Sequence, residues 1–138
     1  MTGPPRFRLT GLLVPLLALL LVLSPATAVW SAPVQWREVL ASEAGQQWWD
    51  AGSLRWDRNG HLSVLSRFLP AAKEDQSRAP LADLYVMQLD CDQDLYRDTS
   101  VNGLPRWNAE WHMGQEDPLV AAVLAAACEA GAELRPRA

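Results

Sequence analysis

The sequence predicts an α+β fold: an antiparallel sheet of about five or six strands, with one C-terminal helix packed on it and stapled to it by a disulfide. Three observations predict this fold. Short apolar segments with alternating side chains are separated by Gly-containing turns. An alanine-rich segment near the C-terminus begins with the Asp-Pro pair typical of a helix start. The two cysteines, Cys91 and Cys128, fall one on a predicted strand and one on the predicted helix.

Length and composition indicate one globular domain. The chain has 138 residues, of which 49% are apolar and 20% are charged, values that are usual for a globular protein. The formal net charge is -4, which argues against a nucleic-acid-binding protein, because such proteins normally carry a basic stripe. The 7 Trp residues need a core, a groove or a partner to cover them.

The first segment predicts export. Arg6 and Arg8 lie near the N-terminus without an acidic residue, and residues 11–24 are almost wholly apolar. Ala26-Thr27-Ala28 then gives the small-x-small pattern of a cleavage site.

We therefore expect residues 1–28 to be a signal peptide and residues 29–138 to be a single exported domain, with an ordered core at about 35–130. The alternative is that this segment stays uncleaved as a membrane anchor. A membrane span needs about 20 apolar residues, whereas this run is shorter and contains Pro15.

Export gives the two cysteines a meaning. An even pair in an oxidising compartment indicates a disulfide between Cys91 and Cys128. Two cysteines with no His nearby do not suit a structural zinc site, which takes four ligands at close spacing. Closing a loop of this length stabilises a domain by roughly 4 kcal/mol in the chain-entropy model.

Alternation and turn residues predict the strands in order. The segments are 34–40, 46–50, 53–56, 61–69 and 81–91, followed by a hairpin of 94–101 with 104–111. Asn59-Gly60 and Asn102-Gly103 mark two of the turns, because both residue types accept a positive φ. The polar, proline-bounded segment 70–80 predicts a loop. Pro105 limits the last strand to a sheet edge.

The helix is predicted over 119–130, with Asp117 as its N-cap, Pro118 in its first turn and Gly131 as its C-cap. Cys128 lies on its apolar stripe. On the strand 81–91, Cys91 shares a face with three apolar side chains. The stripe is Val120, Val123, Leu124, Ala127 and Cys128, and the strand face is Tyr85, Met87, Leu89 and Cys91. The disulfide would therefore tie the helix to the sheet.

A series of short motifs covers residues 35–128. They are Trp36-Arg37-Glu38-Val39, Trp49-Asp50-Ala51-Gly52-Ser53, Arg55, Asn59-Gly60, Tyr85 to Asp90-Cys91, Tyr96-Arg97, Trp111 with Gly114, and Cys128. In their order and spacing the chain resembles the surface-adhesin protein E-like family of small exported bacterial proteins. The resemblance implies an antiparallel sheet whose C-terminal helix is held by the Cys pair, and the family takes its name from an adhesin that binds host extracellular matrix. The chain differs from the common pattern in Trp49, where Tyr is usual, in its proline-bounded loop and in its acidity.

No residue pattern predicts chemistry. Asp90, Asp92 and Asp94 start like a calcium loop, but Leu95 and Val101 stand where that loop needs Gly and Glu. No catalytic signature surrounds His61 or His112, which are expected on the surface. We expect no metal, no cofactor and no enzymatic activity.

The first hypothesis for function is therefore a non-enzymatic exported envelope protein, adhesin-like or an accessory subunit, that works through protein contacts. Trp and Arg are common anchors of such contacts. The candidate contact residues are Trp48, Trp49, Arg55, Trp56, Arg58, Arg106 and Trp107. Trp48 and Trp49 are neighbours on a predicted strand and must point to opposite faces.

The alternative is a small apolar ligand-binding protein with a pocket between sheet and helix, lined by Met87, Leu89, Val123 and Leu124. The expected partner is an envelope or extracellular protein. We expect no nucleic acid, and a membrane only through the signal segment if it is uncleaved. The expected location is the periplasm, the lumen of an internal membrane system or the cell surface of a bacterium.

Overall fold

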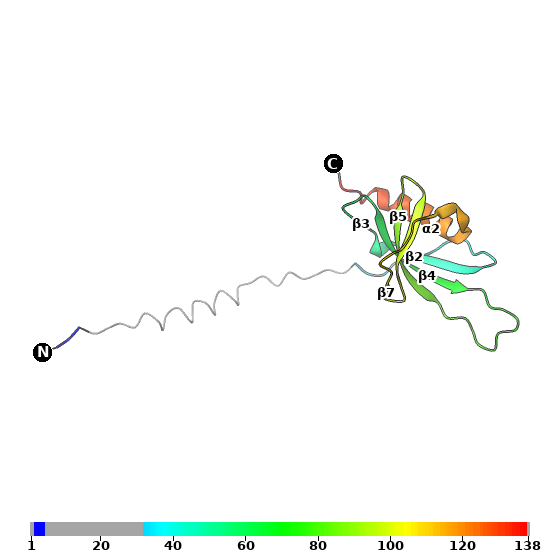
Figure 1. Cartoon of the computed structure of the whole chain (residues 1–138), viewed down its shortest axis with the longest axis horizontal. Coiled ribbons are helices and arrows are strands. Elements are labelled where there is room, and N and C mark those ends of the chain that lie inside the picture. Colours follow the sequence, from blue (N-terminus) through cyan, green and yellow to red (C-terminus); the bar gives the residue numbers. More distant parts are fainter. Residues whose placement is uncertain (1, 5–31, 138) are drawn as a thin grey trace. The chain divides into compact units, whose positions relative to one another are not determined.

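The computed structural model describes residues 2–4 and 32–137; the apolar segment 11–24 and the predicted cleavage site after Ala28 lie outside them. Residues 32–137 form an antiparallel sheet with one helix, α2, against one of its faces (Figure 1). The predicted α+β fold is confirmed. Within the described part of the chain, no helix is long and apolar enough to cross a membrane.

Four longer strands form the body of the sheet, and four short strands lie at its margins. The longer strands are β2 (Gly45–Asp50), β4 (Leu62–Pro70), β5 (Asp83–Asp90) and β6 (Leu95–Val101). The short ones are β1 (Trp36–Glu38), β3 (Arg55–Trp56), β7 (Leu104–Pro105) and β8 (His112–Met113). The order is β1-β2-β4-β5-β6-β7, with β3 beside β4 and β8 beside β6. Eight strands result because the chain breaks into short pieces at the margins.

The margins differ most from the prediction. Only Trp36–Glu38 of the predicted strand 34–40 pairs with β2, and Ser53 belongs to the short 3-10 turn η1 (Ala51–Ser53). The predicted strand 104–111 ends at Pro105, whose lack of a backbone N–H suits a strand end. The chain then leaves the sheet and pairs with β6 again at β8, ahead of a second 3-10 turn, η2 (Gly114–Glu116).

The core lies between the central strands and α2. Val64 pairs with Met87, and Leu62 with Leu89, across β4 and β5, and all four side chains are fully buried. Trp49 enters the same core from β2 and is only 3% exposed. From the helix the core receives the predicted stripe, of which the buried members are Val120, Val123, Leu124 and Ala127.

Helix α2 (Pro118–Ala132) begins as predicted, with the carboxylate of Asp117 accepting hydrogen bonds from the backbone N–H groups of Leu119 and Val120. The prediction that Gly131 ends the helix is wrong, because the helix continues to Ala132 and Glu133 is its C-cap. Gly131 packs on the sheet instead. A Cβ atom there would lie 2.6 Å from Cδ2 of Leu62, so the glycine permits a close approach of helix and sheet.

The predicted disulfide joins Cys91 and Cys128, with Cα atoms 5.7 Å apart. Cys91 is the first residue after β5 and lies in the turn that leads to β6. Cys128 lies in the second half of α2. The disulfide therefore anchors the helix to the end of a central strand.

Candidate interaction surface

The sheet face opposite α2, here called the helix-free face, carries its own set of large side chains. Strand pairing decides which residues meet there, because side chains alternate between the two faces. Trp48 is next to Trp49 and points away from the core. Trp48 pairs with Glu38 on β1 and with Arg67 on β4. The side chains of Glu38, Trp48 and Arg67 therefore form a row across three strands.

Trp36, Trp48 and Arg67 make the Trp–Arg cluster. The guanidinium carbon of Arg67 lies 4.3 Å from the ring centroid of Trp48 and 5.2 Å from that of Trp36. The indole N–H of Trp48 donates to Oε1 of Glu38 at 2.9 Å. Cation–π contacts of this kind contribute about 0.5–1 kcal/mol at exposed sites and about 2 kcal/mol when desolvated. The arginine is thus held in place by rings on two neighbouring strands.

Within the described part of the chain, the charge of Arg67 has no counter-ion. Among residues 32–137 it forms no ion pair within 4 Å, and its Nε is buried without a hydrogen-bond partner. Trp36 is 36% exposed and Trp48 is half-buried. The Trp–Arg cluster therefore presents a preformed but unpaired cation beside accessible aromatic surface.

Away from the Trp–Arg cluster, the helix-free face carries a polar network whose members hydrogen-bond to one another. Nε of Arg97 donates to Oε1 of Gln88 at 2.7 Å, and the side-chain amide of Gln88 donates to Asp57. Trp111 covers the Arg97 guanidinium, with 4.5 Å between ring centroid and Cζ. Here, unlike at Arg67, the cation is hydrogen-bonded within the chain.

His61 belongs to this network, which corrects the expectation that it lies on the surface. Its side chain is 21% exposed, with Nδ1 3.5 Å from Oδ2 of Asp57 and Nε2 3.9 Å from Oδ2 of Asp90. Burial alone would raise the pKa of Asp57, but backbone N–H groups of His61 and Asn59 outweigh it and lower that pKa. His112, by contrast, is exposed as expected.

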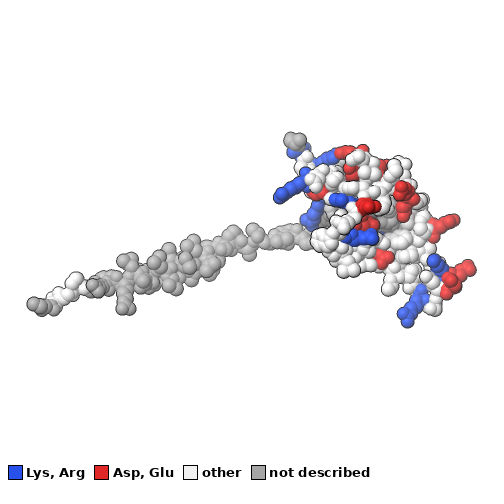
Figure 2. All heavy atoms as spheres, in the orientation of Figure 1, with Lys and Arg blue, Asp and Glu red and all other residues white. Residues whose placement is uncertain are grey.

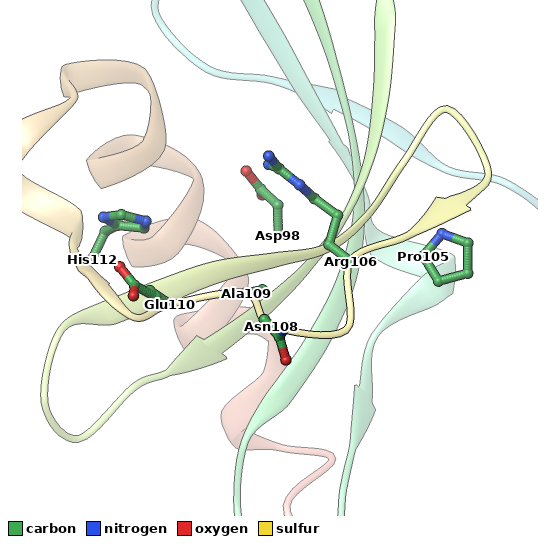
Figure 3. A pocket seen from close by; sticks show the side chains of 7 residues that line it. All are labelled: Asp98, Pro105, Arg106, Asn108, Ala109, Glu110 and His112. Atoms are coloured by element: carbon green, nitrogen blue, oxygen red, sulfur yellow. The ribbon is translucent and has the colours of Figure 1, made fainter.

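Arg106 and Trp107 lie in the connection between β7 and β8. Trp107 is 89% exposed. Arg106 borders a hollow of about 530 Å³ in which its side chain and that of Asp98 point toward each other, with Glu110 and His112 on the other side (Figure 3). Burial raises the pKa of Asp98, and the charges of Arg106 and His112 oppose that rise.

The predicted contact residues therefore differ in exposure: some lie in the core and others at the surface. Trp49 is a core residue, so its assignment to a contact surface is wrong; its ring is taken up by packing under α2. Trp56 is half-buried, donates its indole N–H to the carbonyl of Gly131 at 2.8 Å and is covered by Arg135. Arg55 and Arg58 are exposed.

Sequence reasoning missed Trp36 and Arg67 as contact residues. The parity of Arg67 within the strand 61–69 already places it on the face opposite Leu62, Val64 and Phe68. What was missing was the knowledge that β2 pairs with β4, because this pairing brings Trp48 beside Arg67.

Two acidic side chains at the turn after β5 make contacts within the chain. The carboxylate of Asp90 accepts from the backbone N–H groups of Asp92 and Gln93, and Asp92 pairs with Arg135 at 2.9 Å. Within the described ranges, no three His, Cys, Asp or Glu side chains gather as metal ligands would. Figure 2 shows cationic and anionic side chains mixed over the visible face, without a basic stripe.

Comparison with known proteins identifies the family of this chain. No curated protein and no solved structure matches the chain. The model of the Surface adhesin-E family matches residues 37–134, a range that contains β2 to β8, α2 and both cysteines. On this match over most of its length, the chain belongs to the surface adhesin-E family.

Proposed function

We propose that this chain is a non-enzymatic exported protein of the bacterial envelope that binds another protein through its helix-free face. Membership in the surface adhesin-E family implies an adhesin-like role, an exported or surface location and contact with extracellular or surface proteins. The observation that carries the proposal is the Trp–Arg cluster, in which Arg67 is held between Trp36 and Trp48 with no counter-ion among residues 32–137.

The cluster has the chemistry of a binding anchor. Arg and Trp are the residues over-represented where binding energy concentrates. A guanidinium that is already oriented loses little conformational entropy when a partner binds. A partner carboxylate could approach the Arg67 edge that the rings leave free, while apolar partner atoms cover Trp36 and Trp48.

The unpaired charge of Arg67 favours an acidic partner segment. By strand register the face also carries Arg55 and Arg97, and these are offset by the carboxylates of Glu38, Asp50, Asp57 and Asp90. The chain as a whole has a formal net charge of -4, so the preference for an acidic partner depends on the unpaired Arg67. Charge complementarity of this kind selects partners and speeds encounter.

The alternative of a small apolar ligand bound between sheet and helix has less support at the predicted residues. Leu89 and Val123 are 0% exposed, Leu124 is 3% exposed, and all three pack in the core. Their close packing leaves no room for a ligand among these three side chains. Met87, the fourth predicted lining residue, borders only a small hollow of about 170 Å³.

The test is a comparison of partner capture by matched variants. The tagged protein, Arg67→Gln and Arg78→Gln are expressed in the native cell, crosslinked in intact envelopes and purified, and captured proteins are quantified by mass spectrometry. Arg78 is an exposed loop residue, so its variant removes the same charge away from the face. We expect one partner at near-equal amount with the wild type and Arg78→Gln, and a loss of at least about tenfold with Arg67→Gln.

Equal capture by Arg67→Gln and the wild type would refute the helix-free face as the binding surface. No partner above background in any sample would contradict the protein-contact function itself.

A further inference from the structure

A second, smaller hollow opens on the helix-covered side, between the sheet and the start of α2. Its volume is about 170 Å³, below the roughly 300–1,000 Å³ typical of sites for drug-sized ligands. It therefore suits a compact chemical group. Met87, only 1% exposed, lines it from the sheet, and Val120 lines it from α2.

Three aromatic rings line this hollow, from three neighbouring strands. Tyr85 lies two residues before Met87 on β5, and Tyr96 lies two residues before Asp98 on β6, which pairs with Met87. Phe68 contributes from β4. By register Phe68 is a diagonal neighbour of Tyr85, at about 7–8 Å, whereas Tyr85 and Tyr96 lie on opposite sides of the Met87–Asp98 pair. The rings of Tyr85 and Tyr96 therefore flank Asp98 on this face. Aromatic ring faces carry negative potential and attract cations.

The charged residues of the lining are both acidic. They are Asp98 and Asp117, and no described Lys or Arg lines this hollow. Asp117 already accepts two backbone hydrogen bonds at the helix start. Asp98 has no hydrogen bond or ion pair among the described residues; Arg106 faces it from the larger neighbouring hollow (Figure 3). Asp98 is thus the carboxylate available to a ligand.

The state of the tyrosines agrees with this arrangement. Burial raises the pKa of both Tyr85 and Tyr96, and nearby carboxylates, Asp98 among them, raise it further. Both phenols are therefore neutral at physiological pH, and their rings remain able to face a cation.

We propose that this hollow binds the quaternary ammonium group of a small organic cation of the choline type, between the rings of Tyr85 and Tyr96, with Asp98 as counter-ion. A methylated ammonium has no N–H to donate, so it gains from polarisable ring surface rather than from hydrogen-bond acceptors. An apolar neutral group would leave the Asp98 carboxylate desolvated and unpaired. This site is independent of the Trp–Arg cluster, which lies on the other face of the sheet.

The first experiment is a calorimetric titration of the purified protein with choline and with dimethylbutanol, its neutral isostere in which carbon replaces nitrogen. We expect binding of choline and at least about tenfold weaker binding of the isostere. Phosphatidylcholine vesicles, with phosphatidylglycerol vesicles as control, form a second arm. Binding of free choline alone indicates a soluble ligand, and additional binding of the phosphatidylcholine vesicles indicates a lipid head group as its source.

Variants then assign the site. Asp98→Asn removes the charge with little change of shape, Tyr96→Leu removes a ring, and Asp75→Asn removes a charge from the exposed loop. We expect choline affinity to fall about tenfold in each of the first two and to stay unchanged in Asp75→Asn. Circular dichroism checks that each variant is folded, and Arg67→Gln should bind choline normally, which separates this site from the protein-contact function.

Absence of choline binding at millimolar concentration, equal binding of the isostere, or undiminished affinity in folded Asp98→Asn would each overturn the proposal. Equal binding would identify an apolar pocket instead.

Discussion

Removing the disulfide is the perturbation whose size follows most directly from the structure. Cys91 and Cys128 are separated by 37 positions, and they join the end of β5 to α2. Without the crosslink, the unfolded chain recovers the closure entropy of that loop, which the chain-entropy model puts at about 4 kcal/mol. Marginal stabilities of about 5–15 kcal/mol are usual for a domain, so this is a large fraction of the total.

The assay is urea denaturation of the double variant Cys91→Ala with Cys128→Ala, beside the wild type with and without reductant. We expect the free energy of unfolding to fall by about 4 kcal/mol and the melting temperature by about 15 °C or more. The slope with urea should rise, because the uncrosslinked unfolded chain exposes more surface. For that reason the free energies, not the midpoints alone, have to be compared.

Reduced wild type should match the double variant, since both lack only the crosslink. A double variant within about 1 kcal/mol of the oxidised wild type would show that the entropy of this loop does not stabilise the domain, and would refute the anchoring role given to the disulfide.

Three further predictions concern single residues. Gly131→Ala should lower the free energy of unfolding, measured with urea, by about 1 kcal/mol, because its Cβ would meet Leu62 at 2.6 Å. In a Leu62→Ala background the same substitution should be neutral or stabilising. Stabilisation by Gly131→Ala in the wild type would contradict the close contact. Asp98→Asn should raise the free energy of unfolding at neutral pH, because the pKa of Asp98 is raised in the folded state. Such a group stabilises the fold below its ordinary pKa of 3.8, and this stabilisation is lost as the pH rises through the folded-state pKa. A gain in stability that does not vary with pH would contradict this prediction. Asp57→Asn should act in the opposite sense, since its pKa is lowered: the variant loses stability above 3.8, and the loss should disappear in acid in the same pH series.

The helix and its crosslink could be predicted from the sequence because their determinants are local. Asp117-Pro118 specifies a helix start within a few residues, and the alternation around Cys91 and the stripe around Cys128 each fix a direction. Agreement between these two periodicities is enough to predict that the helix packs on the sheet, without knowledge of the strand order.

The candidate contact surface could not be predicted as fully, because it depends on non-local pairing. Trp48 and Trp49 were known to point apart, but only the pairing of Trp49 with Ser66 decides which of them faces the core. The same register brings Arg67 over Trp48. Gly131 shows a second limit: its position resembles a helix end, and only its packing against Leu62 reveals a residue that the sheet requires to be small.

The opposite orientation of Trp48 and Trp49 has an evolutionary consequence. Trp49 is buried in the core and Trp48 lies on the other face of the sheet, outside the core, so selection can act on the two separately. Truncating a core aromatic costs about 3–5 kcal/mol, whereas most surface substitutions stay within about 0.5 kcal/mol. A lineage built on this sheet can therefore replace Trp36, Trp48 and Arg67 to follow a changing partner while the scaffold persists.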